Sequence, residues 1–257
     1  MPISYLPVLA TLRDLYTQPR DMQRFRRYLA ALTAGTDDVV LPIGAANPLA
    51  KEHALGRLDE LLGMGAEDIG AAAAAEAASR LAGRVSLEVE VKVSLVLVDD
   101  VGGDWTNRYT TEASVLFPRR GALKRPFATG LAWTSEPPVR ERLYAEVLGA
   151  IYRVVYQQRR GLPVTLRAML DQEGLAQSFA GEVPDLGPDE VVRARRILAE
   201  VGDDPGYPTA FACLYGDEAA QQLGYRSLGL PPRAGFAVAL ADALACRQDP
   251  VAALLNR

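Results

Sequence analysis

Residues 85–111, VSLEVEVKVSLVLVDDVGGDWTNRYTT, decide the fold that the sequence predicts. Apolar and polar side chains alternate over 85–94, which predicts a half-buried strand, and 95–98 are all apolar, which predicts that the strand continues into the core. Aspartates and glycines then interrupt the pattern, as is typical of a tight turn. A new alternation over 105–117, rich in aromatic and β-branched types, predicts a second, antiparallel strand.

A third strand is predicted by the alternation of Phe127, Thr129, Leu131 and Trp133. The sequence therefore predicts an α+β fold with a small, mostly antiparallel sheet of three to four strands over about 84–134, flanked by helices from the N-terminal and C-terminal parts. No connecting segment has the composition of a flexible linker. We accordingly predict one domain over 1–257, with a helical part (1–83), a β-meander (84–135) and a second helical part (136–257).

The composition is that of an ordinary globular protein. Of 257 residues, 49% are hydrophobic and 23% are charged, with a net charge of −4. No apolar run reaches the roughly 20 residues that span a bilayer, and the first residues do not resemble a signal peptide. These features predict a cytoplasmic protein with no membrane partner. The mildly acidic balance argues against a nucleic-acid partner, because such binding usually needs a basic domain.

Cysteine and histidine are scarce, with two cysteines and one histidine in the chain. A disulfide framework and a cysteine-rich zinc or iron–sulfur site are therefore excluded, as is any metal site with several histidines from one chain. Any nucleophilic scheme that needs an imidazole has to use His53. Cys213 comes just before a predicted helix, where a thiol can be activated, although a buried and inert cysteine is the commoner case.

Three aspartates near the end of the first predicted strand are the leading candidates for chemistry. Asp99, Asp100 and Asp104 could hold a divalent cation such as Mg²⁺ or Mn²⁺, because hard cations prefer carboxylate oxygens. Asp99 and Asp100 could also act as catalytic bases. The alternative is a solvated turn, which the same residue types favour for conformational reasons. Neighbours on a strand point to opposite faces, so Asp99 and Asp100 can share a cation only if the backbone turns there.

The residues that follow predict a substrate-binding surface. On a strand, Trp105, Asn107 and Tyr109 share one face and would form an apolar wall with one orienting amide. In the alternative, the two aromatic rings belong to the core and Asn107 satisfies a backbone group. Arg108 faces the opposite side and could bind a carboxylate or phosphate, although a salt bridge to a neighbouring glutamate such as Glu112 is the commoner role.

A second candidate site lies in ANPLAKEH, residues 46–53. Asn47 is predicted to cap a helix that has Pro48 at its first position. The free N–H groups at that helix end could hold an anion, with Glu52 among the substrate-binding residues and His53 as a neutral catalytic base. The alternative is a structural or merely exposed histidine.

Two classes of function fit these observations. In the first, the protein is an enzyme or ligand-binding protein for a small polar, anionic molecule, and it uses the strand-end carboxylates in a hydrolysis or elimination assisted by a divalent cation. In the second, it is a noncatalytic partner-binding or assembly subunit that could form a homo-oligomer. Its alanine-rich helix, predicted over 66–82, and its C-terminal helices would then pack against another chain.

Overall fold

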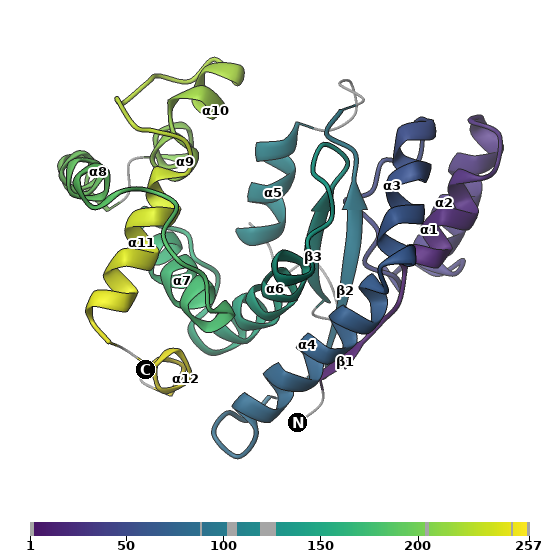
Figure 1. Ribbon diagram of the computed structural model, residues 1–257, viewed down its shortest axis with the longest axis horizontal. Coiled ribbons are helices and arrows are strands. Elements are labelled where there is room, and N and C mark those ends of the chain that lie inside the picture. The colour runs from purple at the N-terminus through teal and green to yellow at the C-terminus, as the bar shows by residue number, and fades with distance from the viewer. Residues whose placement is uncertain are drawn as a thin grey trace. The chain divides into compact units, whose positions relative to one another are not determined.

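The structure is a computed structural model that describes residues 3–87, 89–101, 107–118, 127–203, 206–247 and 249–255 (Figure 1). Its elements in chain order are β1 (Ile3–Tyr5), α1 (Leu9–Tyr16), α2 (Met22–Thr33), α3 (Glu52–Gly63), α4 (Ala66–Leu81), β2 (Val91–Val98), α5 (Arg108–Leu116), β3 (Phe127–Trp133), α6 (Arg140–Arg160), α7 (Leu166–Ala180), α8 (Pro188–Val201), α9 (Tyr207–Tyr215), α10 (Asp217–Gln222), α11 (Ala234–Ala245) and α12 (Pro250–Ala253).

The chain divides into two compact units, Met1–Val155 and Tyr156–Arg257. Helix α6 runs through the boundary. The sequence-based expectation that the whole chain forms one domain stays a prediction. Across the described ranges, every helix is too short or too polar to cross a membrane.

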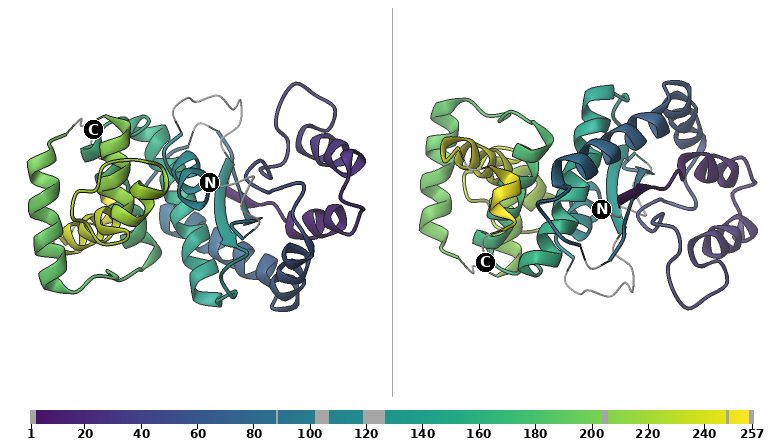
Figure 2. Two further views of the ribbon diagram at one scale, coloured as in Figure 1. Left: turned by 90° about the horizontal axis from the view of Figure 1, so that it is seen from above. Right: turned by 90° about the horizontal axis from the view of Figure 1, so that it is seen from below.

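The sheet belongs to the first unit and has the order β1-β2-β3, with both strand pairs parallel. The prediction of a mostly antiparallel sheet was therefore wrong. Parallel neighbours need long crossover connections, because each strand must start again from the same edge. Here α1–α4 connect β1 to β2, and α5 lies in the connection from β2 to β3. In both views of Figure 2, α1 and α2 (purple) lie on one side of the strands.

The segment predicted as the second strand is helix α5. The Oδ1 atom of Asn107 accepts a hydrogen bond from Thr110 N at 3.1 Å and so caps the first turn. The buried apolar residues Ala113, Leu116 and Phe117 then share a helix face. The sequence pattern misled because Ala113 and Phe117 are apolar at a spacing of four residues, which fits one face of a strand and one face of a helix alike.

Strand β2 forms the centre of the sheet and begins at Val91, so residues 85–90 precede it. Its last four residues, 95–98, are at most 1% exposed, which confirms that this stretch lies in the core. A parallel strand covered on both faces is expected to be apolar throughout, and only Lys92 of β2 is partly exposed.

Small residues let two helices approach the sheet closely. A Cβ atom added to Gly70 of α4 would lie 2.3 Å from the ring of Tyr5 in β1. On β3, a Cβ added to Gly130 would lie 3.5 Å from the backbone of Glu146 and Val147 in α6. The buried face of α4 also contains Ala73 and three further alanines, so part of the alanine-rich helix packs within its own chain.

The second unit, Tyr156–Arg257, consists of helices and connecting loops, with no strand among the residues that the structure describes. Helices α7 and α11 touch through their backbones, since a Cβ on Gly174 would lie 2.3 Å from the carbonyl oxygen of Ala239. The rings of Phe211 and Tyr215 stack at 4.7 Å between centroids, and Phe236 of α11 meets Tyr215 edge-on at 5.1 Å. Shape and aromatic packing therefore organise this core.

Candidate functional site

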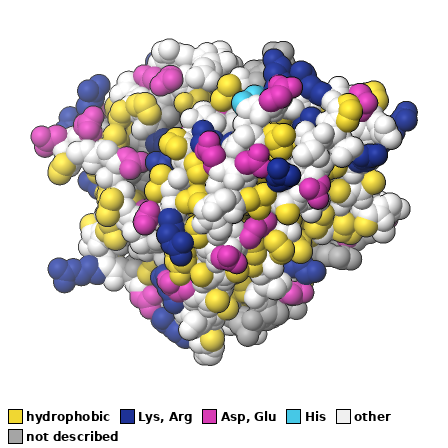
Figure 3. Space-filling view, turned by 45° about the vertical axis from the view of Figure 1, so that its right-hand side comes forward, with side chains coloured by type: hydrophobic (Ala, Val, Ile, Leu, Met, Phe, Trp, Pro, Cys, Tyr) yellow, Lys and Arg dark blue, Asp and Glu magenta, His cyan; other side chains and the backbone are white. Residues whose placement is uncertain are grey.

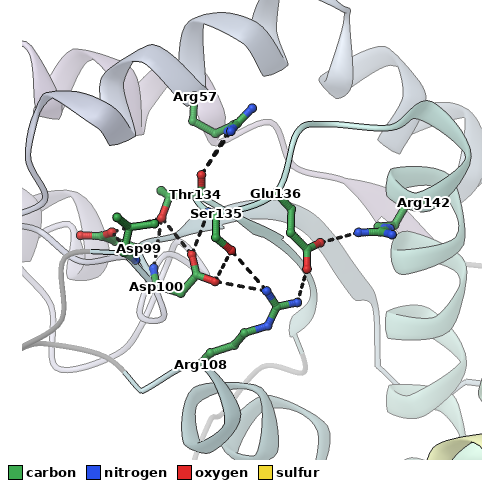
Figure 4. A network of polar contacts seen from close by, with 9 residues as sticks. Arg57, Asp99, Asp100, Arg108, Thr134, Ser135, Glu136 and Arg142 are labelled. Atoms are coloured by element: carbon green, nitrogen blue, oxygen red, sulfur yellow. Dashed lines mark hydrogen bonds and ion pairs between the residues drawn. The ribbon is translucent and has the colours of Figure 1, made fainter. Parts of the chain in front are cut away.

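The candidate site lies where β2 and β3 end, at the same edge of the parallel sheet (Figure 4). Asp99 and Asp100 follow β2, and Thr134 and Ser135 follow β3. The hydroxyl oxygen of Thr134 lies 3.1 Å from Oδ1 of Asp99 and 3.0 Å from Oδ1 of Asp100, and it accepts a hydrogen bond from Asp100 N at 3.1 Å. One threonine thus connects the two carboxylates, which point in different directions.

Asp99 carries the buried carboxylate of the site, with only 3% of the residue exposed. Its Oδ2 atom accepts a hydrogen bond from Nδ2 of Asn47 at 3.0 Å, and its Oδ1 atom lies 2.7 Å from Nε2 of His53. The backbone N–H of Val101 also donates to Oδ1, at 3.2 Å. A carboxylate can remain ionised in a buried place when donors surround it in this way.

His53 is the second residue of helix α3, and 32% of its side chain is exposed. Its Nε2 atom faces Asp99, whereas Nδ1 has no hydrogen-bond partner in the part of the chain that the structure describes. Because a carboxylate oxygen accepts hydrogen bonds, the contact with Asp99 favours the tautomer with the proton on Nε2. Nδ1 then carries the lone pair, and the imidazole, cyan in Figure 3, reaches the molecular surface.

Side chains of α1 and α2 form hydrogen bonds with the segment that precedes α3. Three of its backbone carbonyls accept hydrogen bonds from them: Ile43 O from Tyr28 Oη at 3.1 Å, Asn47 O from Tyr16 Oη at 2.7 Å, and Ala50 O from Arg24 Nη2 at 2.9 Å. These contacts fix the positions from which Asn47 and His53 reach Asp99.

Asn47 is not the helix cap that the sequence predicted, because α3 begins at Glu52 with Lys51 as its N-cap. The Oδ1 atom of Asn47 instead accepts a hydrogen bond from Leu49 N at 2.9 Å, which forms a local turn before the helix. The side-chain amide of Asn47 is thereby directed at Asp99.

Asp100 belongs to an ion-pair network on the other side of Thr134 (Figure 4). It accepts hydrogen bonds from Ser135 N at 2.9 Å and Ser135 Oγ at 2.6 Å, and from Nη1 of Arg108 at 3.2 Å. Arg108 also pairs with Glu136, which in turn binds Arg142. The guanidinium groups of Arg108 and Arg142 thus balance the carboxylates of Asp100 and Glu136, and Arg108 contacts both carboxylates.

Arg57 lies one turn after His53 on the same face of α3. Its Nε and Nη2 atoms both donate to the carbonyl oxygen of Thr134, each at 3.3 Å, and its Nη1 pairs with Glu60. Helix α3 therefore directs an imidazole and a guanidinium at the ends of β2 and β3.

The structure brings four of the predicted site residues together: Asp99, His53, Asp100 and Arg108. Glu52 is exposed in the first turn of α3. Its predicted role in substrate binding stays a prediction.

Trp105, Asn107 and Tyr109 were predicted to share one binding face because residues 105–117 were predicted to form a strand. Asn107 caps α5, and Tyr109 is half-buried within α5, where residues two apart point roughly 200° apart around the axis. Asn107 and Tyr109 therefore do not form one wall. Trp105 lies outside the described residues.

No group of three His, Cys, Asp or Glu side chains able to hold a metal occurs among the residues that the structure describes. The predicted cation site of Asp99, Asp100 and Asp104 includes one residue outside that part of the chain. In the described part, Asp99 and Asp100 accept hydrogen bonds on all four carboxylate oxygens. The cation site stays a prediction.

Sequence reasoning missed Thr134, Ser135 and Arg57 as members of the site. Thr134 follows β3 and Asp99 follows β2, so a parallel pairing of these two strands would have placed them side by side. The predicted antiparallel meander instead placed residues 105–117 as a strand between these two strands, which kept Thr134 away from Asp99. Arg57 could have been found from its spacing of four residues after His53 on a helix.

The arrangement can move a proton, because His53 presents a surface-exposed ring nitrogen whose opposite nitrogen is fixed by a buried carboxylate. Comparison with known proteins adds no relative, since no family model, no curated protein and no solved structure matches this chain.

Proposed function

We propose that the first unit acts on a small polar, anionic molecule at the carboxyl ends of β2 and β3, with His53 as the general acid–base group. The observation that carries the proposal is the 2.7 Å contact between Nε2 of His53 and the buried carboxylate of Asp99. A carboxylate in this position orients the ring and stabilises the imidazolium that forms when the other nitrogen takes a proton.

The place of the pair in the sheet supports the proposal by analogy with other folds. Open parallel sheets commonly bind ligands outside the carboxyl ends of their strands, and Asp99 and Thr134 directly follow two such ends. The analogy indicates where a ligand binds and says nothing of which reaction follows.

Positive charge near His53 favours an anionic molecule. Helix α3 starts at Glu52 without a side-chain cap from Lys51, and Ala54 N donates to the carbonyl oxygen of Lys51, so the N–H groups of Glu52 and His53 are the ones that an acceptor could use. Arg57 follows one turn later on the face that His53 occupies. In the reaction, Nδ1 of His53 removes a proton from water or from a carbon atom of the substrate, and the imidazolium returns it to the leaving group. Hydrolysis and elimination both fit this sequence of proton transfers, with or without a divalent cation.

His53 is the chain's one histidine, so it offers a direct test by nuclear magnetic resonance. Protein labelled with ¹⁵N-histidine will give one imidazole spectrum, and we expect it to report the tautomer with the proton on Nε2. Small carboxylates and phosphate esters, with and without Mg²⁺ or Mn²⁺, are then added to the sample. A ligand of the site will shift the imidazole signals and raise the melting temperature.

Three variants make the test specific. His53→Gln and Asp99→Asn should abolish the ligand-dependent stabilisation, whereas Asp59→Asn, on an exposed ion pair of the same helix, should retain it. A proton found on Nδ1, or imidazole signals that no ligand moves, would contradict the proposal. A flat response together with a stable oligomer in light scattering would favour the noncatalytic assembly subunit.

A further inference from the structure

The second unit contains a cavity of about 450 Å³ that the proposed function does not use. Most of its lining residues belong to helices α7, α8 and α11. Its floor is apolar and buried, with Leu166, Leu175, Leu198 and Val238 each at most 7% exposed. A cavity of this size lies within the range of about 300–1,000 Å³ that is typical of small-molecule sites.

Small residues on two helices leave this space open. Gly174 and Ala239 line the cavity where the backbones of α7 and α11 touch. Ala243, one turn further along α11, also lines it and is half-exposed. Gly174 sets how closely the two helices approach, and a larger side chain at the half-exposed Ala243 would take up part of the cavity.

The charged residues that line the cavity already have partners. Arg195 donates from Nε to Oδ1 of Asp242 at 2.9 Å, and Arg167 donates in the same way to Asp203 at 2.9 Å. The fifth lining charge, Asp171, accepts a hydrogen bond from Oη of Tyr156 at 2.6 Å and lies 3.5 Å from Nη1 of Arg160. A charged ligand would have to break one of these pairs or remain without a counter-charge on the apolar floor.

The volume also distinguishes a small molecule from a bound helix. One turn of α-helix fills roughly 400–600 Å³, given its diameter of about 10–12 Å and its pitch of 5.4 Å. Helices that bind in grooves use anchors spread over two turns, at positions i, i+3, i+4 and i+7. The cavity holds no more than one turn, so a small molecule fits it better than a helical peptide.

We infer that this cavity binds a neutral, largely apolar small molecule. The inference is independent of the proposed function, because it depends on other residues in the other unit. The paired charges at the rim exclude ions in favour of neutral compounds, and the buried floor supplies the free energy of binding through apolar contact.

The chain contains its own reporter for this site. Cys246 lines the cavity and is exposed, whereas Cys213 in α9 is fully buried. Burial raises the pKa of the Cys213 thiol to about 11, so Cys213 should not react at neutral pH, and activation of this thiol is not favoured. These are the two cysteines of the chain, and alkylation should therefore occur at Cys246 alone.

The test measures the rate at which iodoacetamide alkylates Cys246 while the neutral, environment-sensitive dye 6-propionyl-2-(dimethylamino)naphthalene is titrated. We expect saturable dye fluorescence with one site per chain. At a dye concentration of about ten times its Kd, alkylation should slow about tenfold, because only the unoccupied form reacts. Decan-1-ol should displace the dye, and decanoate should displace it at least about tenfold less well, which corresponds to about 1.4 kcal/mol.

Two tryptophan variants of α11 locate the site. Ala243→Trp fills the cavity and should abolish both dye binding and protection of Cys246, whereas Ala245→Trp, exposed on the same helix and outside the lining, should retain both. Leu170→Trp in α7 is the second filling variant if Ala243→Trp does not fold. Equal loss in the Ala243 and Ala245 variants, unsaturable dye binding, unchanged alkylation, or equal competition by decanoate would each overturn the inference.

Discussion

Two buried regions of this molecule are built in different ways. The edge where β2 and β3 end is organised by hydrogen bonds, with Asp99 receiving donors from Asn47 and His53. The core around α9 and α11 is organised by shape, with rings in contact and glycines set against backbone. The stability of the first region depends most on the identity of single polar atoms. The stability of the second depends most on whether a single methyl group is present. The following variants test this difference.

The largest effect is expected in the shape-organised core, from Gly216→Ala. Gly216 has φ +85°, and a Cβ atom there would lie 2.2 Å from the carbonyl oxygen of Pro231. This backbone conformation, with φ +85° and ψ 178°, costs about 1–3 kcal/mol for alanine and the clash adds about 1–3 kcal/mol, so the free energy of unfolding should fall by about 2–6 kcal/mol. Urea denaturation measures the change.

Gly224→Ala is the matched control for the clash. Gly224 has φ +71°, but a Cβ there would meet nothing within 4 Å. We expect only the backbone cost of about 1–2 kcal/mol. If both substitutions lower the free energy of unfolding by the same amount, the close approach at Gly216 does not organise this core.

The second effect belongs to the hydrogen-bonded edge. Asp99→Ala removes the acceptor for Asn47, His53 and Thr134, and we expect a loss of about 2–4 kcal/mol because buried donors remain unsatisfied. Asp99→Asn keeps the volume but sets an amide N–H against one of those donors, so it should also destabilise the fold. A melting temperature unchanged in both variants would show that the network contributes no stability.

Tyr16→Phe isolates the contribution of one hydrogen bond to stability, because it removes one hydroxyl and leaves the shape of the ring. The Tyr16 hydroxyl donates to the carbonyl oxygen of Asn47 at 2.7 Å, and Tyr16 is 6% exposed. We expect a loss of about 1–2 kcal/mol in denaturation. The signal of His53 should move as well, since Asn47 and His53 share Asp99. Thr17→Ala, which removes an exposed hydroxyl next in the chain, should leave that signal in place.

The sequence could predict the burial of a strand better than the pairing of strands. The buried run before Asp99 was recognised because local apolar composition decides burial of a strand. The parallel pairing was missed, since β1 has only three residues, Ile3–Tyr5, and offers no alternation of useful length. The β-like types over 105–117 were outweighed by the cap at Asn107. Pairing is a nonlocal property, and the positions of Asn47 and Thr134 beside Asp99 depend on it.

The smallest effect concerns a carboxyl group where α1 begins. Glu67 of α4 accepts hydrogen bonds from Oη of Tyr5 at 2.5 Å and from Leu9 N at 2.7 Å. Burial raises the pKa of Glu67 above its ordinary value of 4.5, and these hydrogen bonds offset only part of that rise. The folded state therefore holds the proton more tightly than the unfolded state, and folding loses stability as pH rises from about 4.5 through the raised value.

Glu67→Gln removes this titration and keeps an acceptor oxygen for Leu9 N, while its side-chain amide N–H can donate to the hydroxyl of Tyr5, which can also accept. Below pH 4.5, where the carboxyl group is protonated in both states, the variant and the wild type should have similar free energies of unfolding. Towards pH 7 the variant should become the more stable of the two, because only the wild type has to bury an ionised group. Denaturation curves from pH 3.5 to pH 7 measure the difference. A wild type that gains stability relative to the variant as pH rises would show that the hydrogen bonds to Tyr5 and Leu9 outweigh burial, so that this small site resembles the Asp99 edge more than the apolar core.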